Sequence, residues 1–180
     1  VWYTLGMPRT KLQGQVAIVT GASRGIGRAV ASRLAEDGFE IVAAYRTGVA
    51  EIDELVAAVA EKGGGARPIQ FDVAAREAVR EAIAADIDEH GPYYGVVCNA
   101  GISRDNAFPL LSDDDWDSVV DTNLGGAYNV LSASVMPMVR RRQPGRIVTI
   151  ASVSGIMGNR GQTNYSASKA GIIGLTKALA

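Results

Sequence analysis

Short apolar runs alternate along the chain with longer segments whose apolar residues recur at the helical period. The short runs are rich in β-branched residues and predict five strands, at residues 16–20, 39–45, 68–71, 96–98 and 147–150. Between them, apolar positions three or four residues apart predict helices that bury one face. These helical stripes are Ile26, Ala29, Val30 and Leu34; then Ile52, Leu55, Val56 and Val59; then Val79, Ala82, Ile83 and Ile87.

A longer helix is predicted to begin after Ser112. The run Ser112-Asp113-Asp114-Asp115 resembles a capping box, with acidic residues at the positive end of the helix dipole. The inner stripe of this helix comprises Trp116, Val119, Val120, Asn123, Leu124, Ala127 and Leu131. A last helical pattern begins near Tyr165 and reaches Ala180 without a residue that would end it.

Strands that are apolar throughout, separated by amphipathic helices, predict a parallel sheet covered on both faces. Right-handed crossovers then give a doubly wound, Rossmann-like α/β fold with strand order 3-2-1-4-5. A ligand crevice is expected at the carboxyl ends of the first and fourth strands. This topology brings together the turn after the first strand, Arg46, Asn99-Ala100-Gly101 and Ser152.

Composition narrows the class of protein. The 180 residues suit one domain, and 47% hydrophobic with 21% charged residues is a globular composition. With 18 basic and 19 acidic residues the net charge is -1, which argues against a nucleic-acid partner.

The chain has one cysteine and one histidine. Cys98 has no disulfide partner, so a cytoplasmic setting is expected, and Cys98 and His90 together cannot form a zinc site. His90 is interpreted as a cation in a last helical turn, and no apolar run is long enough to span a membrane.

A glycine-rich turn follows the first predicted strand. It reads Thr20-Gly21-Ala22-Ser23-Arg24-Gly25-Ile26-Gly27 and opens a helix. Glycines let the backbone approach a phosphate closely, and the N–H groups and dipole of a helix N-terminus attract it. The spacing is G-x-x-x-G-x-G. Because tight strand-to-helix turns also need glycine for steric reasons, the turn alone leaves nucleotide binding and a purely structural role open.

Arg46 follows the second strand, where a dinucleotide-binding fold recognises the adenosine ribose. A carboxylate at this point would bind the 2′-hydroxyl of NAD, whereas an arginine offers bidentate contacts to a 2′-phosphate. Arg24 in the glycine turn is a second candidate for the same group. This pattern favours NADP(H), although both side chains are equally compatible with solvated surface positions.

Tyr165 and Lys169 lie four residues apart in a helical pattern, so they share one face. A free phenol holds its proton up to about pH 10, which is too high for efficient proton transfer near neutrality. An ammonium about 4 Å away stabilises the phenolate by about 4 kcal/mol at an effective dielectric constant of about 20. This predicts an activated tyrosine, while a plain surface contact is the alternative.

Two further polar residues are candidates for the same site. Ser152 follows the fifth strand, where it is able to share a substrate oxygen with Tyr165 or to act only as a turn residue. Asn123 falls in the buried stripe of the long helix, where an amide needs hydrogen-bond partners. Its two alternatives are bonds to neighbouring backbone and the holding of a proton-relay water.

These motifs together resemble the short-chain dehydrogenase/reductase family over nearly all of residues 14–180. The residues that carry the resemblance are the glycine turn, Asn99-Ala100-Gly101, Asn123, Ser152 and Tyr165-Ser166-Ala167-Ser168-Lys169. The resemblance implies that Tyr165 is the catalytic acid and that Lys169 activates it and holds the nicotinamide ribose. It implies that Ser152 orients the carbonyl and that Asn123 keeps the relay water in place. The cofactor-binding set that it implies is Gly21, Ser23, Arg24, Gly25, Ile26, Gly27, Arg46, Asp72, Val73, Asn99, Ala100, Gly101, Tyr165 and Lys169.

Within that family, residues 158–171 are most similar to β-ketoacyl-[acyl-carrier-protein] reductases, which reduce 3-oxoacyl thioesters with NADPH in fatty acid or polyketide assembly. The resemblance implies an acyl carrier protein as partner and a homotetramer. The run Arg140-Arg141-Arg142 suits contact with an acidic carrier protein and equally suits a helix C-terminus without a partner. The alternatives are a reductase or dehydrogenase for another ketone or alcohol, such as a sugar, steroid or polyketide, and a nucleotide-binding fragment without catalysis.

The ends of the chain lead to two further expectations. Residues 1–13 are expected to be an extension, with Met7 as a natural start and residues 1–6 foreign to the protein. Residues 14–180 are expected to form the NADP(H)-binding catalytic domain with its C-terminal part missing, because the last helix has no cap and an apolar fifth strand would be an unpaired edge. Cys98 as a nucleophile has no base beside it in the sequence.

Overall fold

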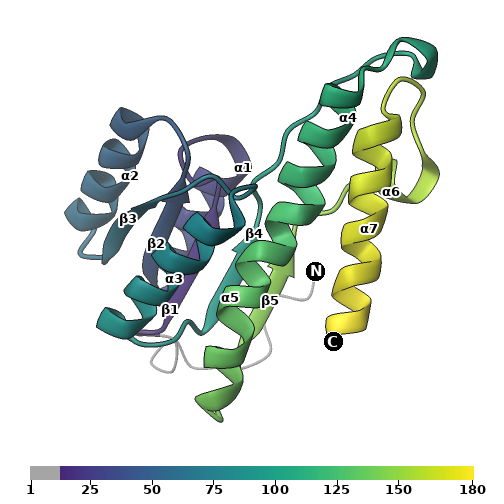
Figure 1. Ribbon diagram of the computed structural model, residues 1–180. Coiled ribbons are helices and arrows are strands. Elements are labelled where there is room, and N and C mark those ends of the chain that lie inside the picture. The colour runs from purple at the N-terminus through teal and green to yellow at the C-terminus, as the bar shows by residue number, and fades with distance from the viewer. Residues whose placement is uncertain (1–12) are drawn as a thin grey trace.

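The computed structural model describes residues 13–180, so the expected foreign residues 1–6 lie outside the described part of the chain. A parallel sheet forms its centre (Figure 1). Its strands are β1 (Val16–Thr20), β2 (Glu40–Tyr45), β3 (Ala66–Gln70), β4 (Gly95–Cys98) and β5 (Arg146–Thr149). Their order is β3-β2-β1-β4-β5, which confirms the predicted doubly wound, Rossmann-like topology.

Helices cover both faces of the sheet (Figure 1). They are α1 (Gly25–Glu36), α2 (Val49–Glu61), α3 (Arg76–His90), α4 (Asp113–Val120), α5 (Gly126–Arg140), α6 (Ser154–Met157) and α7 (Thr163–Leu179). Helices α1 and α2 pack on one face of the sheet, and α3 and α5 pack on the other. In the described part of the chain, no helix is both long and apolar enough to cross a membrane.

Strand β1 shows why the strands read as continuous apolar runs. Ala17 and Val19 point into the core under α1 and α2, whereas Ile18 points into the core under α3 and α5. All three side chains are at most 1% exposed. A strand buried on both faces has no position for a polar residue, so the period-two alternation of a half-exposed strand is absent.

Two features of the predicted helices are wrong in detail. Ile26 is 62% exposed and the buried residues of α1 are Gly27 and Ala31, so the predicted stripe is rotated at its start. The predicted long helix is interrupted by a π-helical turn, η3 (Asp121–Gly125), between α4 and α5. Trp116, the first residue of the inner stripe predicted for this long helix, is 37% exposed instead of buried.

The predicted helix cap at Ser112, at the start of α4, is confirmed. The Ser112 hydroxyl oxygen accepts a hydrogen bond from the Asp115 backbone N–H at 3.1 Å and donates to the Asp115 carboxylate at 3.0 Å. The first bond satisfies a backbone N–H group that an uncapped helix would leave to water, and the second joins the two side chains. The cap fixes where the chain turns from the segment after β4 into the helix that leads to Asn123.

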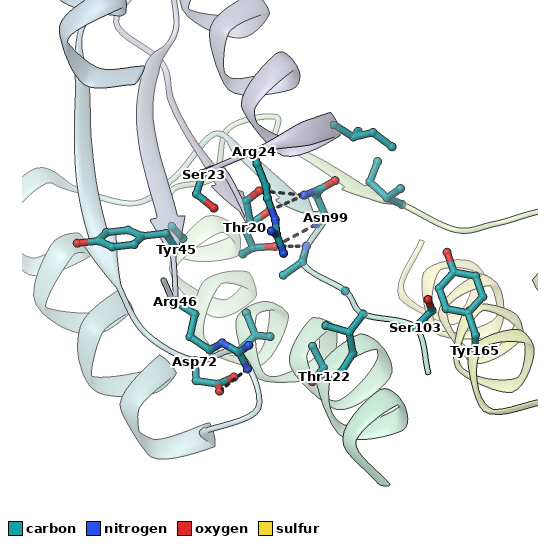
Figure 2. Close-up of a pocket in the computed structure, with 18 of the residues that line it drawn as sticks. Thr20, Ser23, Arg24, Tyr45, Arg46, Asp72, Asn99, Ser103, Thr122 and Tyr165 are labelled. Carbon is teal, nitrogen blue, oxygen red and sulfur yellow. Dashed lines mark hydrogen bonds and ion pairs between the residues drawn. The ribbon is translucent and has the colours of Figure 1, made fainter. Parts of the chain in front are cut away.

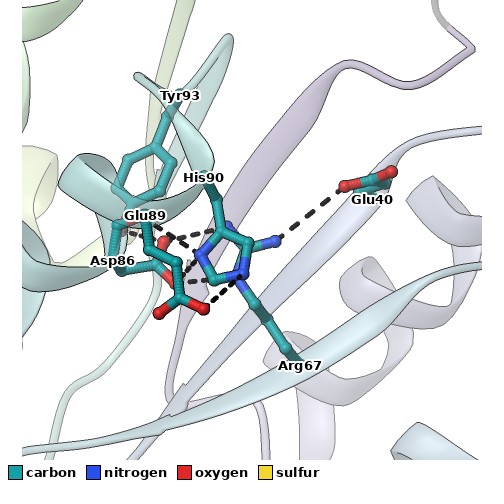
Figure 3. A network of polar contacts seen from close by, with 6 residues as sticks. All are labelled: Glu40, Arg67, Asp86, Glu89, His90 and Tyr93. Carbon is teal, nitrogen blue, oxygen red and sulfur yellow. Dashed lines mark hydrogen bonds and ion pairs between the residues drawn. The ribbon is translucent and has the colours of Figure 1, made fainter.

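A polar network joins β3 to the end of α3, at the amino ends of the strands (Figure 3). Arg67 donates two hydrogen bonds to the Asp86 carboxylate, at 2.6 and 2.9 Å, and the Tyr93 hydroxyl donates a third at 2.9 Å. Burial raises the pKa of Asp86, but the bonds from Arg67 and Tyr93 outweigh it and leave the pKa below its ordinary value. His90 ends α3 as predicted, with Nδ1 3.3 Å from the Asp86 backbone oxygen.

We expect Asp86→Asn to lower the free energy of unfolding by about 1–3 kcal/mol at pH 7, because it removes the carboxylate that accepts two hydrogen bonds from Arg67. Since the folded-state pKa of Asp86 is depressed, its contribution is present above its unfolded pKa of about 4 and is lost as the pH falls further. Urea denaturation of both proteins should therefore show a difference that shrinks below about pH 4. Glu77→Gln, in the exposed pair with Arg80, is the control and should change nothing measurable. Equal stability of Asp86→Asn and wild type at pH 7 would contradict this account.

Candidate active site

A cleft of about 640 Å³ opens at the carboxyl ends of β1 and β4, where the topology predicts it (Figure 2). Residues of the predicted site that line it are Gly21, Ser23, Arg24, Ile26, Arg46, Asp72, Val73, Asn99, Ala100, Gly101, Ser152, Tyr165 and Lys169. Three other predicted residues, Gly25, Gly27 and Asn123, are not part of the lining. The structure therefore brings together segments that are as far apart in the chain as the glycine turn and α7.

Thr20 and Asn99 lock the glycine turn to the end of β4 (Figure 2). The Thr20 hydroxyl oxygen accepts hydrogen bonds from the backbone N–H groups of Asn99 and Ala100, both at 3.0 Å. The Asn99 amide nitrogen donates to the backbone oxygens of Thr20 at 2.9 Å and Gly21 at 3.4 Å. The sequence interpretation did not assign Thr20 to the site. In the sequence, the only indication of such a role is that Thr20 is a hydroxyl residue at the end of an otherwise apolar strand, next to a glycine.

The glycine turn is shaped by one backbone conformation and one close approach. Gly21 has a φ of +67°, in the left-handed region that residues with a Cβ rarely adopt. A Cβ on Gly27 would overlap the Gly21 carbonyl oxygen and lie 2.5 Å from the Asn99 amide nitrogen. Glycine at this position therefore lets the first turn of α1 sit directly against β1 and β4.

The N-terminus of α1 has the properties of an anion site. Its cap residue, Arg24, makes no side-chain capping bond, and the first turn carries no acidic residue. The first N–H groups of a helix need an acceptor, and the helix dipole favours a negative one. These features fit the pyrophosphate of a dinucleotide.

Arg46 and Asp72 form an ion pair on the side of the cleft away from Tyr165, 3.2 Å apart (Figure 2). The second carboxylate oxygen of Asp72 accepts from the Ala74 backbone N–H at 2.9 Å, which fixes the acid. The Arg46 side chain is 57% exposed, so its remaining N–H groups are accessible from the cleft. This arrangement presents a guanidinium held in place by a carboxylate.

Tyr165 and Lys169 lie in the first two turns of α7 and share one face, as predicted. The Lys169 ammonium lies 5.6 Å from the centre of the Tyr165 ring. Its side chain is nearly buried and donates to the Ile150 backbone oxygen at 2.6 Å. Burial lowers the pKa of Lys169 because it disfavours the charged form. Gly101 lies next to both Asn123 and Lys169, because a Cβ on it would be 3.0 Å from the Asn123 amide oxygen and 3.7 Å from the Lys169 ammonium.

Ser152 reaches the cleft from the segment after β5. Its hydroxyl oxygen accepts a hydrogen bond from the Ser154 backbone N–H at 3.2 Å. Because that bond uses an oxygen lone pair, the Ser152 proton stays available to a group in the cleft.

Asn123 clamps the segment after β4 to α7 from within the π-helical turn. Its amide oxygen accepts from the Ile102 N–H at 2.8 Å, and its amide nitrogen donates to the Ile102 oxygen and the Ser168 hydroxyl, both at 3.0 Å. At 1% exposure the side chain is fully engaged by these partners. The structure thus shows the first alternative that the sequence left open, and the water-relay role stays a prediction.

Two residues considered from the sequence lie away from this chemistry. Burial raises the pKa of the Cys98 thiol to about 12, so the thiolate is not formed near neutrality. The Arg141 guanidinium stacks 5.5 Å from the Tyr94 ring centre and donates to Gln15 and to the Pro144 backbone oxygen. It is therefore engaged within the protein, at the end of α5 that leads into the amino end of β5.

The sequence interpretation missed part of the cleft wall. Besides Thr20, the missed residues are Ala44, Tyr45, Thr47, Phe71, Ile102, Ser103, Thr122, Ile150, Ser154 and Gln162. Ser154 and Gln162 are polar and line the same part of the cleft as Ser152 and Tyr165. Their only sequence signal is their closeness to those two residues.

A Rossmann-like sheet with a glycine turn at one end of its cleft and a Tyr-Lys-Ser group at the other defines a dinucleotide-dependent oxidoreductase. The chain belongs to the short-chain dehydrogenase family, whose model matches residues 15–180. Members of this family use a nicotinamide cofactor, and the residues of the cleft fit one.

The relatives are more specific. The chain is 58% identical over 166 residues to a 3-oxoacyl-[acyl-carrier-protein] reductase of Aggregatibacter actinomycetemcomitans, covering 92% of this chain and 69% of the relative. It is 42% identical over 171 residues to the 3-oxoacyl-[acyl-carrier-protein] reductase of Synechocystis, covering 95% and 69%. A reductase of the same name from Staphylococcus epidermidis is 42% identical over 164 residues, covering 91% and 67%.

Proposed function

We propose that this protein reduces a 3-oxoacyl thioester on an acyl carrier protein to the 3-hydroxyacyl form with NADPH, in fatty acid or polyketide synthesis. The observation that carries the proposal is the convergence of Tyr165, Lys169 and Ser152 on one end of a cleft whose other end is the glycine turn. The names of the relatives support the substrate class.

The side chains divide the work of reduction. The nicotinamide cofactor supplies a hydride to the carbonyl carbon. Tyr165 donates its proton to the carbonyl oxygen, and the nearby Lys169 ammonium stabilises the phenolate that remains. Ser152 donates a hydrogen bond to the same oxygen and so places it beside Tyr165. Asn123 holds the two segments that border this space and, in the proposal, the water that returns a proton.

The cofactor proposal assigns the pyrophosphate to the turn Gly21–Gly27, with Ser23, Arg24, Gly25 and Ile26 around it. Asp72 and Val73 border the adenine, and Asn99, Ala100 and Gly101 line the middle of the cleft. Arg46 binds the 2′-phosphate of NADP(H) through the guanidinium that Asp72 orients.

We expect Arg46→Asp to lower the preference for NADPH over NADH at least about tenfold, because a carboxylate repels the 2′-phosphate and accepts from the ribose hydroxyl. The measurement is the ratio of kcat/KM for the two cofactors at fixed acetoacetyl-CoA. Arg80→Asp on the exposed side of α3 makes the same charge change and should leave the ratio unaltered. An unchanged ratio in Arg46→Asp would mean that the 2′-phosphate is held elsewhere.

The first experiment is oxidation of NADPH by the full-length protein with acetoacetyl-CoA as a carrier-free substrate. Turnover supports the proposal, and a panel of sugars, steroids and other ketones separates it from a short-chain reductase of different substrate class. NADPH binding without turnover on any of these substrates would indicate a nucleotide-binding protein instead.

We also propose a cytoplasmic homotetramer that meets its carrier protein through Arg140 and Arg142. The third arginine of the run, Arg141, is held by Tyr94 and neighbouring groups. Light scattering tests the tetramer. The KM of charge-reversed Arg140 and Arg142 variants, compared between carrier-protein and CoA substrates, tests the docking surface.

A further inference from the structure

Gln162 connects three segments at the catalytic end of the cleft. Its backbone oxygen accepts from the Ser166 N–H at 2.7 Å, so it belongs to the start of α7, the helix that carries Tyr165. Its amide nitrogen donates to the Asp105 carboxylate at 2.8 Å. Its amide oxygen accepts from the Ser154 hydroxyl at 3.2 Å and from the Asn159 amide nitrogen at 2.9 Å.

The partners allow the Gln162 amide only one orientation. The Asp105 carboxylate can only accept, so it requires the amide nitrogen of Gln162. With its nitrogen on Asp105, the Gln162 amide presents its oxygen to the Asn159 amide nitrogen and the Ser154 hydroxyl, which both donate to it. A flipped Gln162 amide would point its oxygen at the Asp105 carboxylate and lose that bond. The three contacts therefore fix both the position and the direction of the Gln162 side chain.

Ser154 links the fixed Gln162 side chain to Ser152 through two hydrogen bonds. The Ser154 hydroxyl is held by Gln162, and its backbone N–H donates to the Ser152 hydroxyl oxygen at 3.2 Å. A second hydrogen bond lies next to the one between Gln162 and Asp105, since the Asn106 N–H donates to the Gly161 backbone oxygen at 2.8 Å. Ser152 and Tyr165 come from different segments. Gln162 reaches Ser152 only through Ser154, and it precedes Tyr165 by three residues.

We propose that Gln162 is a positioning residue that sets the Ser152 hydroxyl relative to Tyr165, so that both hydroxyls reach one carbonyl oxygen. This inference rests on the proposed function. Gln162 acts through Ser154 and Asp105 and needs no contact with the substrate. Two hydroxyls on separate segments converge only if those segments are held to a fraction of an ångström, and misplacement by about 1 Å costs up to about a hundredfold in rate.

Gln162→Met keeps the length of the side chain and removes all three hydrogen bonds. We expect kcat with acetoacetyl-CoA and NADPH to fall about tenfold or more, because the two hydroxyls lose their alignment. The Kd for NADPH and the urea midpoint should stay at wild-type values, since the cofactor end of the cleft is not touched. Gln143→Met, the same change in the exposed turn between α5 and β5, is the control and should leave kcat unaltered.

Gln162→Glu separates positioning from a general structural role by its pH dependence. Above its pKa the new carboxylate faces Asp105, and the two like charges push their segments apart. When the pair holds one proton, the protonated Glu donates to Asp105 as the amide did and still accepts from Ser154 and Asn159. The kcat of Gln162→Glu divided by that of wild type should therefore rise as the pH is lowered.

Other charges near this pair set the pH of that rise. Arg104 adjoins Asp105 and lies 3.8 Å from the Asp115 carboxylate of α4, and Arg160 precedes Gln162 by two residues. Both cations favour the ionised form of the new carboxylate, whereas Asp105 favours the protonated form. Lys169 and Tyr165 on α7 are common to the variant and the wild type, so the ratio removes their titration.

The outcomes separate this inference from the proposed function. If wild-type protein does not reduce acetoacetyl-CoA, the proposed function fails and this inference fails with it. If wild type is active and Gln162→Met keeps its kcat, only the inference is overturned. If Gln162→Met does not fold, Gln162→Glu decides, and a kcat ratio that stays flat between pH 8 and pH 5 overturns the inference.

Discussion

Tyr165→Phe is expected to lower kcat by about a hundred- to ten-thousandfold while leaving NADPH binding intact, because it removes only the proton that general acid catalysis transfers. The ring, its contact with Lys169 and the packing of α7 are kept in this variant. The measurements are NADPH oxidation with acetoacetyl-CoA and a fluorescence titration with NADPH in the absence of substrate.

Tyr128→Phe is the matched control for this prediction. Tyr128 lies on the exposed side of α5, 48% exposed, where its ring packs 5.2 Å from the Arg76 guanidinium. The same hydroxyl removal there should alter neither turnover nor cofactor affinity. Wild-type turnover in Tyr165→Phe would end the proposed mechanism, whereas loss of NADPH binding would show that the hydroxyl serves the cofactor instead of the substrate oxygen.

The sheet could be predicted from the sequence because burial on both faces leaves little freedom in composition. Strand β1 is found at the predicted residues, and the order of strands follows from right-handed crossovers. Strands β2, β4 and β5 begin within one residue of the prediction, whereas β3 begins at Ala66, two residues before it. It is an edge strand in which Arg67 and Gln70 are tolerated, so its apolar run is shorter than its hydrogen-bonded length.

The helical details that failed have a common cause. A π-helical turn adds a residue to one turn without changing the residue types, so the stripe through Val119 and Asn123 reads the same with or without it. Ile26 lies in the first turn of α1, where its side chain lines the cleft and does not cover the sheet. Periodicity cannot distinguish a residue that covers the core from one that lines a cleft next to it.

The site was predictable where one segment carries its own chemistry, as in the glycine turn or the Tyr165-Lys169 pair. It was not predictable where a role depends on contacts between distant segments. Thr20 meets Asn99 across 79 positions, and Gln162 meets Asp105 across 57. A threonine at a strand end and a glutamine before a helix often have no special role. Their hydrogen bonds to distant segments are therefore visible only in the folded structure.

Gly27→Ala is expected to raise the Kd for NADPH at least about tenfold and to lower the free energy of unfolding by about 1–3 kcal/mol, the usual cost of overpacking. The added Cβ overlaps the Gly21 carbonyl oxygen and meets the Asn99 amide nitrogen at 2.5 Å. Both neighbours belong to the locked junction of β1 and β4, so the relief has to come from α1 moving outward. That movement displaces the N–H groups which receive the pyrophosphate.

Gly174→Ala shows what the same methyl group does without a steric conflict. No atom lies within 4 Å of a Cβ at this helical position in α7. Alanine there should raise the free energy of unfolding by about 0.5–1 kcal/mol, because glycine loses more conformational freedom in a helix. Paired NADPH titrations and urea denaturations of the two variants therefore separate the close approach at Gly27 from the general effect of replacing glycine. Wild-type affinity and stability in Gly27→Ala would show that the turn has room to adjust and that the phosphate site does not depend on this contact.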